Sequence, residues 1–288
     1  MIRAIGYELL KLKCQKKNYV MLFGHLGFYI LSFMAYRTNR SGARLLEILK
    51  RTGFDMDYIQ FITSCLDGPF FARMVMIPVF VALLPIAVAT LAGDCIAGEV
   101  QDGSMKLFLA RPRSRTQVVF AKFFAIYLVT LMYSIYFAVS TMLISIALLG
   151  LSPVQVIFMF GRWGVDFTLM TQEAAFIRYG VMTVYFSFSL MALASISIFL
   201  STWFNRMTTA TIVAITIYFV SYIVAALPFA EPIKPFMISE IMGNGTAFMF
   251  WMTHIPAIKM IENLAVLGCY ICGFLTLAVI NFNCKDIK

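Results

Sequence analysis

Long stretches without a single charged residue divide this chain. Between successive Asp, Glu, Lys and Arg side chains, six runs of 19 to 39 uncharged residues occur within its 288 residues. A helix that crosses the hydrocarbon layer of a membrane needs about 20 mostly apolar residues. Only 13% of the residues are charged and 61% are apolar, which is too little charge to cover the water-facing surface of a soluble domain. The sequence therefore predicts a membrane protein.

Each uncharged run is predicted to be one helix, because lipid cannot satisfy backbone N–H and C=O groups and a single hydrophobic block pairs them only as a helix. The predicted fold class is an all-α integral membrane protein with six transmembrane helices. In the third run, Ser152-Pro153 ends the helix. A seventh uncharged run, 241–258, is interrupted by Gly243, Asn244, Gly245, His254 and Pro256 and is interpreted as an interfacial or re-entrant segment. The predicted spans are residues 18–36, 74–93, 118–150, 179–201, 208–230 and 262–283.

The distribution of Lys and Arg predicts the orientation of these spans. Six spans place both termini on one side, and cytoplasmic termini put thirteen Lys and Arg residues inside against ten outside. We therefore expect a multi-pass protein of the cell membrane with both termini cytoplasmic. The cations lie at membrane edges, so the net charge of +9 indicates anionic lipid and not nucleic acid as the partner. The predicted extracytoplasmic segments are 37–73, 151–178 and 231–261.

Residues 1–17 have the pattern of an amphipathic helix. Ile2, Ile5, Leu9 and Leu12 recur at near-helical spacing among basic residues, which predicts a helix lying in the headgroup plane. A plain basic flank of the first span is the alternative. The basic stretch leads into a full-length apolar block without a small-residue cleavage site, so we expect no cleavable signal peptide.

The sequence contains no motif of a P-loop ATPase and too few histidines for a multi-histidine metal site. No G-x-x-x-x-G-K-[ST] motif is present, so we expect no ATP-binding P-loop. The chain has only two histidines, His25 and His254, so we expect no metal site. We also expect no catalytic residues. His25 lies in the first span, where it is either a gate or proton site or, more simply, an imidazole hydrogen-bonded to a neighbouring helix.

The segment 94–117, between the second and third spans, carries the most informative pattern. Gly103 predicts a turn, after which residues 104–110 form a short helix with apolar side chains on one face. Pro112 ends this helix and is followed by a basic turn. Ser114 and Gln117 have the spacing of a capping box at the start of the third span. An apolar surface at the tip of such a helix indicates a partner protein, or otherwise the membrane surface.

This segment resembles the ABC type-2 permease family. The resemblance rests on a D-x-I-x-G-E pattern, a glycine turn, an apolar stretch, a proline with flanking arginine and a lysine entering the next helix. Gly103-Ser104 stands where the family has Gly-Thr. The six-span layout and the N-terminal helix also match. The matching residues are Asp94, Ile96, Gly98, Glu99, Gly103, Leu107, Leu109, Pro112, Arg115 and Lys122.

The resemblance implies a permease subunit of an ATP-binding cassette exporter. Two permease chains, as a homodimer or heterodimer, would pair with two separate ATPase subunits, which hold the ATP and Mg²⁺, while this chain binds no cofactor. The segment 94–117 would contain the coupling helix that sits in a cleft of the ATPase. The residues carried over to this interface are Glu99, Gly103, Ser104, Met105, Phe108, Leu109, Arg111, Pro112, Arg113 and Arg115.

Neutral polar residues within the spans are candidates for a translocation path. They are Tyr133, Tyr136, Thr211, Tyr218 and Tyr222. Hydrogen bonding between helices is the alternative explanation for each of them. Two further functions are weighed: a membrane-embedded enzyme, for which no catalytic cluster is visible, and a secondary transporter or channel-like protein. The latter is favoured only by Pro78 and Pro85, which are expected to break the second span.

Overall fold

The computed structural model describes residues 2–38, 66–105, 114–161, 164–242, 250 and 256–285. Within these residues, six helices are long and apolar enough to cross a membrane, which confirms the predicted fold class. A shorter helix, α1 (Ile2–Lys13), precedes them. The six are α2 (Lys16–Thr38), α5 with α6 (Gly68–Pro78 and Leu84–Gln101), α8 (Arg115–Leu149), α9 (Gln172–Trp203), α10 (Met207–Ala225) and α13 (Ala257–Cys284).

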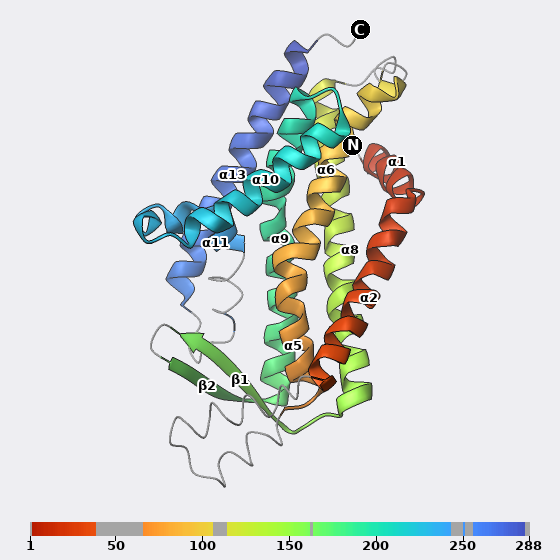
Figure 1. Cartoon of the computed structure of the whole chain (residues 1–288). Coiled ribbons are helices and arrows are strands. Elements are labelled where there is room, and N and C mark those ends of the chain that lie inside the picture. The colour runs from red at the N-terminus through yellow and green to blue at the C-terminus, as the bar shows by residue number, and fades with distance from the viewer. Residues whose placement is uncertain are drawn as a thin grey trace.

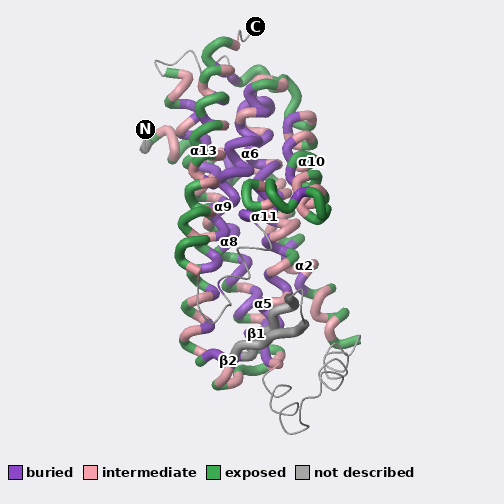
Figure 2. Tube along the Cα trace, turned by 90° about the vertical axis from the view of Figure 1, so that its left-hand side faces the viewer, coloured by how far each residue is buried: buried purple, intermediate pink, exposed green. Residues whose placement is uncertain are grey.

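The helices form one bundle around α9. Helices α5, α6, α8 and α9 run side by side, with α1 and α2 on one side and α10 and α13 on the other (Figure 1). In the most apolar 18-residue stretch of α9, 78% of the residues are buried. The corresponding share is 17% in α10 and in α13 and 11% in α2. Purple, buried positions accordingly concentrate on α6 and α9 (Figure 2). The exposed apolar faces of the outer helices therefore face lipid or another chain.

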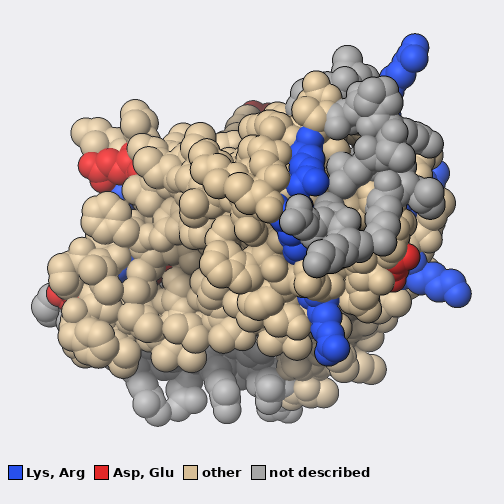
Figure 3. All heavy atoms as spheres, turned by 90° about the horizontal axis from the view of Figure 1, so that it is seen from above, with Lys and Arg blue, Asp and Glu red and all other residues tan. Residues whose placement is uncertain are grey.

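Both termini lie at one end of the bundle, here called the terminal end (Figure 1). Seen from above, this end carries most of its visible Lys and Arg side chains on the side of α1, and much of the remaining face is uncharged (Figure 3). A strand pair lies at the opposite end, here called the hairpin end. The two ends thus differ in secondary structure.

The second span continues through both of its prolines. Instead of the expected break, the structure has a single π-helical turn, η1 (Val79–Leu83), between α5 and α6. Proline has no N–H and leaves a carbonyl of the preceding turn without its helical donor, and a local π turn accommodates the mismatch. Tyr218 of α10 donates a hydrogen bond of 2.8 Å from its hydroxyl to the Val81 carbonyl in this turn. The widened turn is thereby tied to α10.

Helix α10 ends at Ala225, before the predicted boundary at residue 230. Leu227 precedes Pro228 and has extended backbone angles (φ −85°, ψ 138°) because the proline ring excludes the helical conformation there. Two 3₁₀ turns, η2 (Pro228–Ala230) and η3 (Lys234–Phe236), follow, and then α11 (Ile238–Met242). The chain from η2 to η3 projects from the side of the bundle (Figure 1). Residues 243–249 and 251–255, which hold most of the predicted interfacial or re-entrant segment, lie outside the described residues.

An antiparallel hairpin that the sequence analysis did not predict occupies part of segment 151–178. Strands β1 (Val154–Gly161) and β2 (Gly164–Thr171) pair with Val154 opposite Thr171 and Gly161 opposite Gly164. Alternating β-branched and aromatic residues on both sides of a short glycine-flanked connection favour this structure. The uncharged run of residues 123–161 therefore contains both the third span and the first strand.

Asp67 joins three elements at the hairpin end. Its Oδ1 accepts a hydrogen bond of 3.1 Å from the Phe70 N–H and caps α5, while its Oδ2 accepts from Ser152 N–H (2.8 Å) and Gln155 Nε2 (2.7 Å). Next to it, Gly68 N–H donates to the Gly150 carbonyl at 3.1 Å. These contacts fix the start of α5 against the end of α8 and the start of the hairpin.

Candidate functional site

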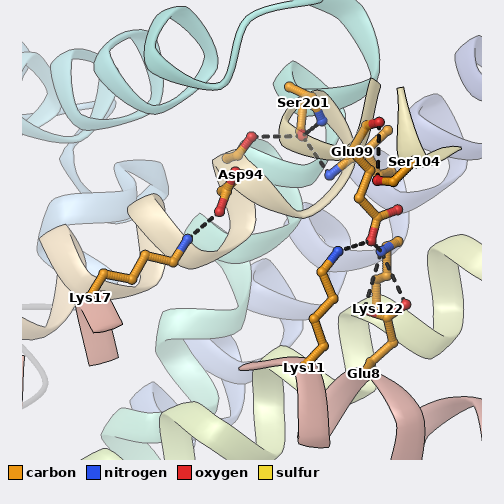
Figure 4. Close-up of polar contacts among 11 residues, drawn as sticks. Glu8, Lys11, Lys17, Asp94, Glu99, Ser104, Lys122 and Ser201 are labelled. Atoms are coloured by element: carbon orange, nitrogen blue, oxygen red, sulfur yellow. Dashed lines mark hydrogen bonds and ion pairs between the residues drawn. The ribbon is translucent and has the colours of Figure 1, made fainter. Parts of the chain in front are cut away.

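Four charged side chains meet where α1, α6 and α8 converge at the terminal end. Lys122 Nζ of α8 lies 2.6 Å from Glu99 Oε1 of α6 and 3.1 Å from Glu8 Oε1 of α1. Lys11 of α1 bonds the same Glu99 oxygen. Figure 4 shows the four side chains pointing toward one another from the three helices. We call this group the Lys122 cluster.

The Lys122 cluster is balanced in charge, and three of its four side chains are buried, while that of Lys11 is 37% exposed. The side chain of Lys122 is 1% exposed, and those of Glu8 and Glu99 are each 6% exposed. Two lysines face two carboxylates, so no formal charge remains uncompensated. Removal of charges from water is tolerated only with close partners, and loss of one partner leaves a costly buried charge. The cluster therefore fixes how α1 and α8 sit on α6.

A second ion pair ties α2 to the same helix. Lys17 bonds Asp94 Oδ2, five residues before Glu99 in α6 (Figure 4). A Cβ at Gly98 would lie only 2.0 Å from Asp94 Oδ1, so the glycine leaves room for this carboxylate. The acidic residues of the D-x-I-x-G-E pattern thus both hold the N-terminal segment of the chain.

The backbone of this pattern is fixed from its other side by α9 and α10. Ser201 Oγ of α9 donates to the Gly93 carbonyl at 2.7 Å and accepts from the N–H groups of Ile96 (3.1 Å) and Ala97 (2.8 Å). A Cβ at Gly93 would lie 2.5 Å from Thr211 Oγ1 and 3.1 Å from Thr211 Cα of α10. Glycine at this position permits the close approach of α6 and α10.

The predicted amphipathic helix packs its apolar stripe on the bundle. Leu12 is buried in the core, and Ile5 and Leu9 pack against it, while Tyr7 and Leu10 are exposed. Glu8 lies on the same face as the stripe and enters the Lys122 cluster. The helix is thus seated on protein along its apolar face, and its position in the headgroup plane remains a prediction.

The described residues of the predicted ATPase interface are divided between surface and core. Gly103 has a left-handed backbone (φ +72°), as expected of a turn glycine. Ser104 is exposed, and its hydroxyl donates to the Glu99 carbonyl at 3.4 Å. Met105 is fully buried and packs in the core. Phe108, Leu109, Arg111, Pro112 and Arg113 lie outside the described residues.

Arg115 points to the C-terminal end of α13. Its Nη1 donates to the carbonyls of Phe282 (2.8 Å), Asn283 (3.1 Å) and Lys285 (2.7 Å), which a helix end leaves without donors. Lys285 Nζ in turn donates to the Thr202 carbonyl of α9 at 2.7 Å, and burial lowers the pKa of this ammonium group. Arg115 therefore links the start of α8 to α13.

The start of α8 has the predicted cap. Ser114 has extended backbone angles, and its Oγ accepts a hydrogen bond of 3.3 Å from the Gln117 N–H. Residues 102–114 thus connect the end of α6 to a capped α8, and Glu99 and Lys122 lie on either side of this connection.

The five candidate path residues are not brought to one common site. Tyr133 is buried and stacks on Phe137 at 6.0 Å between ring centroids, whereas Tyr136 is partly exposed. Thr211 and Tyr218 lie on α10, which packs on α6 and α9. Tyr222 is near Tyr218, with 6.2 Å between ring centroids. Two cavities, one between α8 and α9 and one between α13 and the chain that follows α10, are not lined by any of the five residues. Their role in translocation remains a prediction.

Tyr218→Phe distinguishes a role of Tyr218 in the translocation path from a hydrogen bond between helices. The exchange leaves the Val81 carbonyl without its donor, so we expect a loss of about 1 kcal/mol in the free energy of unfolding. Unfolding in mixed detergent micelles measures this loss, and transport by the folded variant should stay near the wild-type rate. A large fall in transport with unchanged stability would assign Tyr218 to the path instead.

His25 has the hydrogen-bonded arrangement that was the simpler interpretation. The side chain is fully buried, its Nε2 lies 3.0 Å from Thr141 Oγ1 of α8, and its ring packs on Phe137 at 4.1 Å between centroids. Tyr29, one turn further along α2, bonds Ser145 Oγ at 3.0 Å. Polar groups thus join α2 to α8, as is common between helices in lipid.

Sequence reasoning missed the partners in this site. Glu8, Lys11 and Lys17 were assigned only to a basic helix, and Ser201 to no role. One signal was present, because Glu8 lies among the apolar positions of α1, where a charge must find a partner.

Among the described residues, no group of three or more His, Cys, Asp or Glu side chains could hold a metal ion.

Six membrane-crossing helices, with a buried ion cluster where two of them, α6 and α8, meet α1, define a multi-span α-helical membrane protein. The profile of the family described as ABC-2 family transporter protein matches residues 6–287. The chain therefore belongs to the ABC-2 transporter family and is a transmembrane permease, a component of membrane transport. A comparison with curated proteins gives no match.

Proposed function

We propose that this permease is the membrane subunit of an ATP-binding cassette exporter. Two permease chains, identical or different, assemble with two copies of an ATPase subunit that holds the ATP and Mg²⁺. The terminal end faces the cytoplasm, and ATP hydrolysis in the partner drives alternating access. Family membership supports the ATPase partner, and the geometry of the terminal end supports the route of coupling.

The Lys122 cluster is the observation that carries this proposal. Residues 102–114 connect α6 to α8, and the ion pairs of Glu99 and Lys122 hold the two helices together next to that connection. Glu8 and Lys11 add α1 to the same unit. Ser201 adds the central helix α9. A force applied to the connection therefore moves four helices together, which is what a rigid-body transition requires.

The ATPase contact in this proposal combines an apolar tip with a basic turn. Phe108 and Leu109 enter the cleft of the ATPase, and Arg111, Pro112 and Arg113 stop and orient the short helix. Glu99, Met105 and Arg115 act from within the permease, because they are engaged with its own helices. Gly103 and Ser104 form the turn that follows α6.

Replacement of the apolar tip tests this contact. In Phe108→Asp combined with Leu109→Asp, we expect the ATPase to be lost from the purified complex, because two carboxylates cannot enter an apolar cleft without large desolvation costs. Co-purification through a tag on the permease and ATP hydrolysis in proteoliposomes measure the effect. Leu151→Asp, an exchange of an exposed leucine at the hairpin end, is the matched control. Retention and stimulation of the ATPase by the double variant would contradict the proposal.

The secondary transporter or channel-like alternative gains no support from the second span. Transporters of that kind use unwound backbone carbonyls at a helix break to bind ions. Here the helix continues through η1, and the Val81 carbonyl in that turn accepts the Tyr218 hydroxyl. Substrate transport by the purified permease without any ATPase would nevertheless decide in its favour.

A further inference from the structure

A charged cavity lies on the side of the bundle, between the chain that follows α10 and the first turns of α13. Its volume is about 700 Å³, within the range of ligand sites. Carboxylates and ammonium groups both line it, together with an aromatic ring. The residues concerned are Glu231, Lys234, Phe236, Glu240, Lys259 and Glu262. None of them belongs to the Lys122 cluster or to the predicted ATPase interface.

The cavity lies at the boundary of the membrane-crossing helices. Glu262 is followed by 22 uncharged residues up to Lys285, roughly 33 Å of helix at 1.5 Å per residue, which is one membrane thickness. Glu231 likewise follows the 24 uncharged residues after Arg206. The charges that line the cavity therefore stand next to lipid headgroups. Acidic side chains with a basic one beside them are visible at this edge, opposite the cations near α1 (Figure 3).

The chain beside the cavity exposes large apolar side chains. Leu227, Phe229, Ile233 and Phe236 are 38%, 74%, 48% and 60% exposed, all within ten residues that project from the bundle. Such a group in water would be unfavourable, whereas at a membrane it inserts among acyl chains. A ligand of this cavity therefore reaches it from the bilayer, with its own acyl chains beside these residues.

The charges of the cavity select a zwitterion. Three carboxylates and two lysines line the cavity, and the ion pair between Lys234 Nζ and Glu240 Oε1 is long at 4.0 Å. Among the described residues, Lys259 and Glu262 form no ion pair, although both line the cavity from the same face of α13. An ammonium group would be held by the carboxylates and a phosphate by the lysines.

The type of ammonium follows from the lining. Quaternary ammonium groups are typically bound by several aromatic rings, whereas Phe236 is the single aromatic residue among the described residues of this lining. A primary ammonium donates three hydrogen bonds and matches carboxylate acceptors. We propose that this cavity binds the headgroup of a zwitterionic phospholipid with a primary ammonium, of the phosphatidylethanolamine type, as a lipid site separate from the energy-coupling end.

Lipid binding to the purified full-length permease tests this site without any ATPase. Native mass spectrometry counts bound lipid while phosphatidylethanolamine, phosphatidylcholine or phosphatidylglycerol with identical acyl chains is titrated. We expect phosphatidylethanolamine to bind about tenfold more tightly than the other two, since each lacks one matching charge-assisted contact. Equal binding of the three lipids would overturn the proposal.

The double variant Lys259→Ala with Glu262→Ala tests whether this cavity is the site that prefers phosphatidylethanolamine. Both residues are exposed and form no ion pair with another described residue, so we expect the variant to fold. It should lose the preference for phosphatidylethanolamine, which corresponds to an about tenfold weaker Kd for that lipid. Lys16→Ala with Glu173→Ala, exposed charges in α2 and α9, is the matched control and should keep it. If the first pair fails to fold, Lys259→Ala alone serves the same comparison. An unchanged preference in the folded variant would contradict the site.

A competition experiment separates a lipid from a water-soluble zwitterion. Free phosphoethanolamine has the same two charges but no acyl chains. We expect it not to displace the bound lipid at equimolar concentration, because the apolar side chains around the cavity contribute only when acyl chains are present. Displacement at that concentration would replace the proposed lipid by a soluble ligand.

Discussion

Lys122→Met is expected to lower the free energy of unfolding by about 3–5 kcal/mol, because it removes the cation that two buried carboxylates share. Glu8 and Glu99 would then face each other with Lys11 as their only partner within the cluster. The methionine fills a similar volume, so the loss reports charge and not packing. Equilibrium unfolding in mixed detergent micelles measures it. Lys16→Met, at an exposed lysine of the same end, should change stability by less than about 0.5 kcal/mol.

A double variant distinguishes an unpaired charge from a general effect of substitution. In Lys122→Met with Glu8→Gln, the pair between Lys11 and Glu99 remains and no uncompensated carboxylate is left. We expect this variant to recover most of the stability lost in Lys122→Met, a strong coupling between the two positions. Additive losses from the two exchanges would mean that the cluster does not act as one ion network.

The six spans were predictable because each depends on a local property of the chain. A charge-free run of 19 to 39 residues has few options in lipid, so a helix within it follows from length. Boundaries were less certain where a local signal was overlooked. Leu227-Pro228 ends α10 early, and Asp67 starts α5 before the charge-free run begins. Both are capping or proline effects that a count of charges does not register.

The partners within the site were not predictable, since they come from distant parts of the chain. Lys122 and Glu8 are 114 residues apart in sequence, and Lys11 and Glu99 are 88 apart. No periodicity relates such residues. The motif residues themselves were found through the family resemblance, but their contacts were not. Glu99 and Arg115 were assigned to a surface that binds a partner, and the structure shows both engaged with helices of their own chain.

The hairpin and Met105 illustrate how one strong pattern can conceal another. In the run 123–161, the absence of charge dominated, and the alternation typical of a strand in its last residues was not used. Met105 fitted the apolar face of a short helix, from which exposure was inferred. An apolar side chain is equally suited to its own bundle, and Met105 is buried there.

Gly68→Ala is expected to destabilise the hairpin end although it adds a single methyl group. A Cβ at this position would lie 2.6 Å from the Ser145 carbonyl oxygen and 2.7 Å from Ile146 N and Cα, which are backbone atoms inside α8. Because a helix backbone cannot move aside as a side chain can, α5 and α8 must separate. The expected loss is about 1–3 kcal/mol. It should appear in the same unfolding measurement and as faster hydrogen exchange at residues 66–72.

Gly180→Ala provides the matched control for this prediction. A Cβ at Gly180 in α9 meets nothing within 4 Å, so the same exchange removes only the conformational freedom of glycine. We expect it to be neutral or to stabilise by about 0.5–1 kcal/mol. Opposite signs at the two positions would place the cost of Gly68→Ala in the contact between α5 and α8. If both variants changed stability alike, the close approach at Gly68 would not limit the packing of the second and third spans, and the anchoring role of Asp67 beside it would lose its structural basis.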